Sequence, residues 1–417
     1  MERFENVYGE VENLKGAMLE TLAEMIKIPA ISPNYGYEGE YDKAEKLLEL
    51  IKDWPFDKIE RYDAPDERAK NGVRPNILAY YYGKDHDENS RLWVLSHLDV
   101  VPPGDLEKWT ITDPFTPLIK DDKIYGRGSE DNGQSIVSSL YAVKALMNLG
   151  LRPKKTVVLA FVSDEETGSE KGLKWLMENH SELFRKDDLV IVPDGGNVDG
   201  SFIEVAEKSI LWLRIKVVGK QVHASMPQKG MNAHRIALNL AYKLDKAFHE
   251  KYNAKDELFE PAISTFEPTM ASNPADSPNI VPGEHTFIFD CRVLPNYKID
   301  DILADAHNIA EELKKEFQDE NLPEIHFEVL QRLDAPMPTD PNSKVVQSLK
   351  EALINLRGTN PKIGGIGGGT FAAHFRKLGI PAVVWATLDE MAHQPNEYAK
   401  ISNIVEDAKT IAYLAIN

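Results

Sequence analysis

Three apolar runs in the first half of the chain each lead into a histidine or an acidic residue, and this feature constrains the fold most strongly. The runs and the residues that end or follow them are 92–97 with His97 and Asp99, 155–163 with Glu165 and Glu166, and 188–193 with Asp194. Continuous apolar runs are typical of strands buried on both faces of a parallel sheet. In open α/β sheets the ligand site lies outside the carboxyl ends of the strands. The sequence therefore predicts an α/β sheet with one functional edge.

The pattern of expected elements divides the chain into a main domain and an insertion. In the first part we expect helices at 11–28, 42–52, 134–150 and 172–180, a further strand at 75–82, and a turn at 83–90. Residues 209–219 alternate between apolar and polar, which is typical of an antiparallel sheet with one solvent-exposed face. The other expected elements are helices 232–252, 300–318, 342–356 and 370–378, and strands 284–293, 324–331 and 380–388. We predict a mostly parallel α/β domain flanked by helices, residues 1–208 and 332–417, with a smaller α+β domain inserted at 209–331.

Charge, hydropathy and cysteine content limit the possible binding partners and the cellular compartment of the protein. The chain has 67 acidic and 48 basic residues and a formal net charge of −19, which argues against nucleic acid as a partner and against a basic membrane-surface helix. No apolar run approaches the roughly 20 residues that span a bilayer, and residues 1–6 lack the apolar core of a signal peptide. The single cysteine, Cys291, stands in an apolar stretch and is expected to be a buried structural thiol. We expect a cytoplasmic protein.

Five residues are candidate metal ligands: His97, Asp131, Glu166, Asp194 and His393. Each alone has an ordinary structural explanation, such as Asp131 near the N-terminus of a helix. Together, two imidazoles and several carboxylates suit a pair of divalent transition metals, zinc foremost. Such a pair, roughly 3.5–4 Å apart, needs a bridging carboxylate, for which Asp131 is the natural candidate. Asp99 shares a strand face with His97 and can fix the tautomer of its imidazole.

Glu165 and Glu166 are adjacent in the chain, so both cannot comfortably bind the same metal ion. One of them can bind a metal while the other accepts a proton from metal-bound water. That water would attack a carbonyl polarised by zinc, and the base would return the proton to the leaving nitrogen.

Several segments resemble a family of co-catalytic zinc hydrolases that includes acetylornithine deacetylase, succinyl-diaminopimelate desuccinylase, aminoacylase and glutamate carboxypeptidase. They occur in the family's order over nearly the whole chain, and jointly they are highly specific. The matching stretches are 96–99 with Pro102, 126–131, 164–166, 193–194, 219–225, 279–282, 290–292, 367–370 and His393.

The resemblance implies a role for each matching residue. One zinc ion would be bound by His97, Asp131 and Asp194, and the other by Asp131, Glu166 and His393. Glu165 would be the general base, Asp99 would orient His97, and His223 of the inserted domain would stabilise the tetrahedral oxyanion. The substrate would be held by Asn279, Arg292, Gly368, Gly369 and Thr370. Independently, Thr370 stands where a glycine-rich loop enters a helix, and helix N-termini bind anions such as a carboxylate.

The resemblance also implies an enzyme with two Zn²⁺ per chain, for which Co²⁺ or Mn²⁺ could substitute. It would release an amino acid from an N-acyl amino acid or a short peptide. Deacylase or desuccinylase and dipeptidase or carboxypeptidase activities both remain open, although the Gly-Gly-Gly-Thr run at 367–370 leans toward the dipeptidases. One departure affects this inference: residues 132–134 are Asn-Gly-Gln, where many relatives have Asp or Met and then Lys.

Two other classes of function compete with this interpretation. The first is a non-catalytic binding protein on the same fold, which the presence of Glu165 and all five ligands disfavours. The second is a metal-dependent aminopeptidase, against which the inserted domain with His223 argues. The inserted domain, with a ferredoxin-like α+β arrangement, would act as a lid and dimerisation domain. Its uncovered sheet edge favours a homodimer, in which His223 reaches the partner's site.

Overall fold

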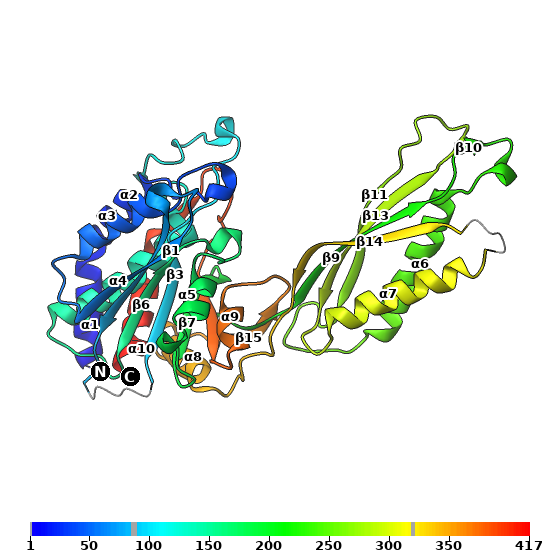
Figure 1. The fold of residues 1–417 in the computed structure, drawn as a ribbon. Helices are drawn as coiled ribbons and strands as arrows, with labels where there is room; N and C mark the ends of the chain where they lie inside the picture. The colour runs from blue at the N-terminus through cyan, green and yellow to red at the C-terminus, as the bar shows by residue number, and fades with distance from the viewer. Residues whose placement is uncertain (1, 85–89, 318–321) are drawn as a thin grey trace. The chain divides into compact units, whose positions relative to one another are not determined.

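The computed structural model describes residues 2–84, 90–317 and 322–417, which form two units (Figure 1). Unit 1 comprises Met1–Val205, Thr339–Ile363 and Thr370–Asn417, and unit 2 comprises Ala206–Pro338 and Gly364–Gly369. Residues 85–89 of the expected turn lie outside the described residues, and so does residue 318 at the end of an expected helix.

Unit 1 is organised around an eight-stranded sheet. Its strands are β1 (Lys58–Pro65), β2 (Val73–Tyr81), β3 (Leu92–His97), β6 (Val157–Val162), β7 (Leu189–Asn197), β8 (Phe202–Glu207), β15 (Lys362–Ile366) and β16 (Ala382–Thr387), in the order β1-β2-β6-β3-β7-β16-β8-β15. The central strands β6, β3, β7 and β16 are parallel. Antiparallel pairing adds β2 and β1 on one side and β8 on the other. The expected parallel sheet is thus the centre of a larger mixed sheet.

Helices lie on both faces of this sheet (Figure 1). They are α1 (Glu2–Asn13), α2 (Lys15–Ile26), α3 (Tyr41–Ile51), α4 (Ser135–Asn148), α5 (Leu173–Asn179), α8 (Lys344–Arg357), α9 (Ala372–Lys377) and α10 (Ile401–Ile416). On one face Leu176 of α5 and Phe375 of α9 join the core around Trp93. On the other face α4 contacts β3, β6 and α10. The short strands β4 (Leu118–Lys120), β5 (Lys123–Tyr125) and β17 (Tyr398–Lys400) form a separate small sheet.

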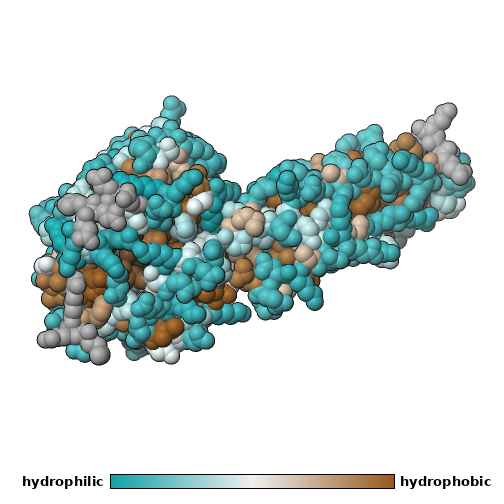
Figure 2. All heavy atoms as spheres, turned by 90° about the horizontal axis from the view of Figure 1, so that it is seen from below, coloured by the Kyte–Doolittle hydropathy of each residue, from teal (hydrophilic) through white to brown (hydrophobic). Residues whose placement is uncertain are grey.

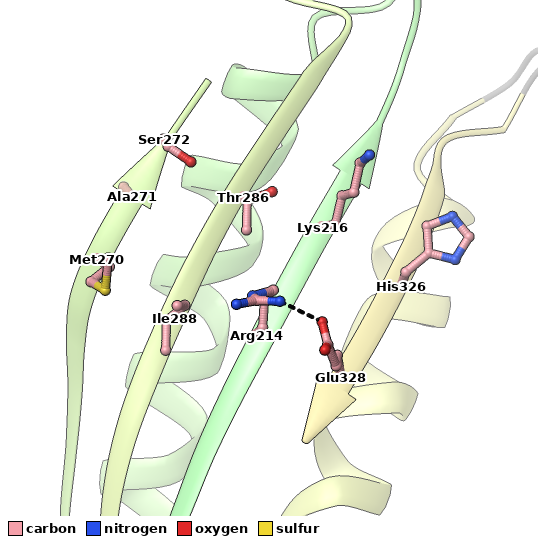
Figure 3. A pocket seen from close by; sticks show the side chains of 9 residues that line it. All are labelled: Arg214, Lys216, Met270, Ala271, Ser272, Thr286, Ile288, His326 and Glu328. Carbon is pink, nitrogen blue, oxygen red and sulfur yellow. Dashed lines mark hydrogen bonds and ion pairs between the residues drawn. The ribbon is translucent and has the colours of Figure 1, made fainter. Parts of the chain in front are cut away.

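Unit 2 contains an antiparallel sheet of β9 (Ser209–Val218), β11 (Thr265–Ser272), β13 (Glu284–Val293) and β14 (Glu324–Leu333), in the order β11-β13-β9-β14. Helices α6 (Ala233–Lys251) and α7 (Ile299–Lys314) share a core with one of its faces. Leu213 and Cys291 point into that core, as their side chains are fully buried. The opposite face is open, and Figure 3 shows the ion pair of Arg214 and Glu328 on it. Nη1 of Arg214 lies 2.8 Å from Oε2 of Glu328. The predicted solvent-exposed face of β9 and the buried cysteine are therefore confirmed.

Some expected elements differ from the observed ones. The expected helix 11–28 spans the end of α1 and the whole of α2, which are separated at Leu14. The sequence analysis did not identify β1, β8, β11, β15 or α10. A two-stranded ribbon of β10 (Val222–His223) and β12 (Ile280–Val281) was not expected either, although it carries one of the predicted site residues.

The surface agrees with the acidic, polar composition. Figure 2 shows a face of the molecule on which hydrophilic residues predominate in both units, with small hydrophobic patches between them. Within the described part of the chain, no helix combines the length and the apolar character needed to cross a membrane.

Candidate metal centre

The predicted ligands gather at the carboxyl edge of the parallel strands in unit 1. His97 is the last residue of β3, and the turn with Glu165 and Glu166 follows β6, its parallel neighbour. Asp194 lies in β7, which pairs with β3 on the other side. Because parallel strands bring their carboxyl ends to one edge, side chains from three separate segments meet there.

Two groups of possible metal ligands share one residue. His97, Asp131 and Asp194 form the first group, and Asp131, Glu166 and His393 form the second. Within each group the ligand atoms lie within 4.8 Å of one another. Oδ1 of Asp131 is 2.9 Å from Nε2 of His97, while Oδ2 is 3.1 Å from Nε2 of His393. The structure thus brings all five predicted ligands together, with Asp131 between the two imidazoles.

A hydrogen bond behind the imidazole of His97 fixes its orientation. Nδ1 of His97 donates to the backbone oxygen of Asp99 at 3.0 Å, which turns the other ring nitrogen, Nε2, toward Oδ1 of Asp131 at 2.9 Å. The Asp99 carboxylate is 3.5 Å from Nδ1. It accepts hydrogen bonds from the backbone amides of Glu165, at 3.1 Å, and Glu166, at 3.0 Å. Asp99 therefore contacts the ring through its backbone and holds the glutamate turn with its side chain.

The turn that presents Glu165 and Glu166 is held from within the protein. Asp164 has a left-handed backbone with φ of 67°, a conformation that non-glycine residues adopt at a cost. Its amide donates to Glu40 at 3.2 Å, and its carboxylate is 3.2 Å from the guanidinium of Arg74. Glu40 and Arg74 are themselves fully buried and paired. This network offsets the strain of the turn.

The site concentrates negative charge. Burial and the charge of Asp194 raise the pKa of Glu165 well above its ordinary value. Burial raises the pKa of Glu166 to about 7. Hydrogen bonds to Asp131 and Glu166 raise the pKa of His393 to about 10. Crowded carboxylates facing two imidazole nitrogens form a donor set that suits divalent metal ions such as zinc.

Asn132 connects two members of the first ligand group. Its side-chain oxygen accepts the backbone amide of His97 at 3.2 Å. Its side-chain nitrogen donates to Oδ1 of Asp194 at 2.8 Å and to the backbone oxygen of Pro193 at 3.1 Å. The residue is buried. The departure noted in the sequence therefore lies beneath the metal ligands and ties two strands together.

Sequence reasoning did not assign roles to Asn132, Glu130 or Glu397, although each contacts the loops that carry the ligands. A signal for Glu130 and Glu397 existed, because each is an acidic residue within four positions of a predicted ligand in a loop. No sequence pattern indicated that Glu40 and Arg74 pair with each other, because they lie in separate elements.

The remaining predicted site residues, apart from Thr370 in unit 1, belong to unit 2 and form two groups there. In the first group, His223 accepts the amide of Ser225 at 3.2 Å through Nδ1. His223 pairs with Ile280, and the amide of Ala224 donates to the backbone oxygen of Asn279 at 2.8 Å. The β10–β12 ribbon therefore brings His223 and Asn279 together.

The second group lies at the other end of β9. Arg292 is opposite Ile210 in the sheet and donates to Asp290 and, at 3.0 Å, to the backbone oxygen of Gly367. Gly369 in the same loop approaches the side chain of Leu333 so closely that a Cβ atom would clash. The strand between the two groups, from Ile210 to Val218, spans roughly 26 Å. Within unit 2, Arg292 and His223 are thus far apart.

A parallel-centred sheet whose carboxyl edge carries a carboxylate shared between two imidazoles is suited to binding divalent metal ions. The comparisons identify the family. The model of peptidase family M20/M25/M40 matches residues 93–417, and the chain belongs to this family. The family and its relatives establish an enzyme that hydrolyses amide or peptide bonds.

Two relatives and one solved structure illustrate the similarity. An uncharacterised metallohydrolase of Methanocaldococcus jannaschii is 41% identical over 400 residues, covering 93% of this chain and 96% of the relative. A succinyl-diaminopimelate desuccinylase of Nautilia profundicola is 31% identical over 335 residues, covering 79% and 84%. Aminopeptidase PepT of Bacillus cereus superimposes with a TM-score of 0.73 at 20% identity, covering 96% and 98%. The PepT structure matches nearly the whole chain and therefore shares its fold.

We predict that Asn132→Ala lowers the stability of the metal-free protein by about 1–3 kcal/mol, because it leaves the buried amide of His97 without its side-chain acceptor. Urea denaturation should show this against Asn179→Ala, which removes an exposed side chain that donates to the backbone oxygen of Trp175 in its own helix and should change stability by less than about 0.5 kcal/mol. Equal effects of the two variants would contradict the assignment.

Proposed function

We propose that this protein is a di-zinc hydrolase that releases an amino acid from an N-acyl amino acid or a short peptide. The observation that carries the proposal is the position of Asp131, whose two oxygens face different imidazoles. A single carboxylate placed in this way suits a bridge between two metal ions. His97 and Asp194 would complete one metal site, and Glu166 and His393 the other.

Zinc is the preferred metal, because imidazole and carboxylate ligands suit it, and Co²⁺ or Mn²⁺ are possible substitutes. Bound there, the ions would acidify water and polarise the substrate carbonyl. The ligand side chains differ in exposure: those of Asp194 and Glu166 are 12% and 7% exposed, whereas that of His393 is 55% exposed. The site is therefore open on the side of His393, where a substrate can enter.

Glu165 is proposed as the general base. It belongs to neither ligand group, yet its neighbour Glu166 is in one of them. The amides of both residues are held by Asp99, so the position of Glu165 is fixed relative to the ligands. From there Glu165 would take a proton from water during attack and deliver it to the leaving nitrogen.

Substrate recognition is assigned to the remaining predicted residues. Arg292 presents a guanidinium that can bind a carboxylate, and the Gly-rich loop ending at Thr370 leads into α9. Asn279 would hold the substrate amide. The desuccinylase relative supports an acyl amino acid as substrate, and the glycine run favours a dipeptide, so both classes are retained. A cytoplasmic location stays a prediction.

A hydrolysis panel of N-acetyl amino acids, N-succinyl amino acids and dipeptides, each with Zn²⁺, Co²⁺ or Mn²⁺, tests the proposal. We expect metal-dependent release of a free amino acid from at least one class, abolished by chelation and restored by added metal. Tripeptides should be included, because their cleavage from the amino end would favour the aminopeptidase alternative. Absence of hydrolysis in a metal-loaded protein would contradict the proposal.

The adjacent glutamates should have separable effects. Glu165→Gln should leave metal content nearly unchanged and lower kcat by about 10²–10⁴-fold, because a general base is lost. Glu166→Gln should instead weaken the binding of one metal ion, because a charged ligand is lost. Metal analysis and kinetics on both variants check this, and the reverse result would exchange the two roles.

We further propose a homodimer in which His223 completes the partner's site. Within unit 2, His223 and Arg292 lie at opposite ends of the sheet, so one unit 2 does not gather all the proposed recognition residues around one substrate. The edge strand β14 carries exposed apolar side chains at Val329 and Leu330. Exposed edges favour pairing with another chain, and two-fold dimers are the commonest closed assembly.

Complementation tests this arrangement. His223→Ala and Glu165→Gln should each have strongly reduced activity alone, but a mixed dimer should regain activity, because one of its two sites then has both residues intact. The heterodimer should be isolated with two affinity tags before the assay. A verified heterodimer without activity would mean that His223 acts within its own chain or has no catalytic role.

A further inference from the structure

Two loops of unit 1 carry two of the three members of the second ligand group, Asp131 and His393. The first loop, residues 126–134, leads into α4 and contains Asp131. The second, residues 388–397, connects β16 to β17 and contains His393. Each loop also contains a buried glutamate, Glu130 in the first and Glu397 in the second. Neither glutamate is part of a ligand group.

The carboxylate of Glu130 binds backbone amides of the second loop. Oε1 accepts the amide of Asp389 at 2.7 Å, and Oε2 accepts the amides of Met391 and, at 3.1 Å, Ala392. Ala392 directly precedes His393. Three hydrogen bonds from backbone amides to one buried carboxyl group fix this stretch of backbone.

The carboxylate of Glu397 binds the first loop in the same manner. Oε1 accepts the amides of Glu130 at 3.0 Å and Asp131 at 3.1 Å, and Oε2 accepts the amide of Gly128 at 3.1 Å. Nη1 of Arg127 also donates to Oε2 at 2.6 Å, which compensates the buried charge. Each loop therefore supplies the acceptor for the other.

The second loop needs such an external support. Glu390 and His393 both have left-handed backbones, with φ of 61° and 65°, and such conformations are unfavourable for non-glycine residues. The His393 side chain is 55% exposed, so packing around the ring contributes little to its position. The backbone is what places His393, and Glu130 binds that backbone.

We propose that Glu130 and Glu397 are reciprocal positioning residues. Glu130 holds the loop that carries His393, and Glu397 holds the loop that carries Asp131. Together they set the spacing between Asp131 and His393. Removing Glu130 should therefore weaken the second ligand group and leave the first, with His97 and Asp194, largely in place. This inference rests on the proposed di-metal function, but the positioning itself is present in the metal-free chain.

The test compares Glu130→Gln with Glu390→Gln in the full-length protein. Both variants remove one negative charge, but the Glu390 side chain is exposed and has no hydrogen bond among the described residues. In Glu130→Gln, one carboxylate oxygen becomes an NH₂ group that faces amides and cannot accept from them. We expect faster hydrogen exchange in peptides covering 388–397 of the metal-free Glu130→Gln protein, and unchanged exchange in Glu390→Gln.

Metal titration provides the second readout. Glu130→Gln should lower the affinity for one of two Zn²⁺ ions by about 10–100-fold, the usual effect of losing a residue that orients a ligand, and retain the other ion. Unchanged hydrogen exchange at 388–397 in Glu130→Gln would overturn the proposal. Equal loss of both ions together with faster exchange throughout unit 1 would also overturn it, because that result indicates a general structural role. If the wild type bound fewer than two ions while the exchange result held, the proposed function would fail and the positioning role would stand.

A more conservative substitution, Glu130→Asp, keeps the proposal testable if Glu130→Gln fails to fold. Glu130→Asp keeps the charge but withdraws the carboxylate by one methylene group, so it should show the same local effects at smaller size. Glu397→Asp should shift the effect to peptides covering 126–134, because the amides of Gly128 and Asp131 then lose their acceptor. Faster exchange in the same peptides for both variants would contradict the reciprocal arrangement.

Discussion

Buried negative charge at the carboxyl edge of the central strands is the constraint on which the rest of unit 1 depends. Carboxylates removed from water are costly unless they are hydrogen-bonded or paired. The protein meets this cost chiefly with backbone amides: Asp99 binds those of the glutamate turn, and Glu130 and Glu397 bind those of two loops. The same hydrogen bonds also position the possible metal ligands. The backbone amides therefore both stabilise the buried charges and determine the geometry of the site.

The division of the chain into two units separates the possible metal ligands from most of the residues proposed to recognise the substrate. All members of the two ligand groups lie in unit 1. Arg292 and His223 lie in unit 2, at opposite ends of one sheet. A rigid antiparallel sheet cannot fold back to bring its ends together, because its strands are held by a continuous ladder and a helical core. The proposed dimer resolves this by supplying one end from each subunit.

The sequence predicted elements with a clear hydrophobic pattern, either continuous as in β3 or alternating as in β9, although it missed β8 and α10, which are largely buried. The strand ending at His97 is buried along its whole length and was predicted at its observed bounds. In contrast, β1 is an edge strand in which half of the residues are exposed and half are charged, and β11 contains Pro268 and a bulge, so neither shows a clear period. The ligands could be predicted because they follow apolar strands or match family motifs. The contact of Glu130 with Asp389 could not, because it joins segments far apart in the chain and no local period encodes it.

The departure from the family pattern at residues 132–134 acquires a different meaning in the structure. On sequence alone, Asn132 made a substrate preference inferred from relatives less secure. The residue is buried and contacts His97 and Asp194, so it has no surface to offer a substrate. An amide at this position donates to a ligand carboxylate, which neither an aspartate nor a methionine can do. Its influence would therefore act through His97 and Asp194 of the first ligand group and not through direct contact with a substrate.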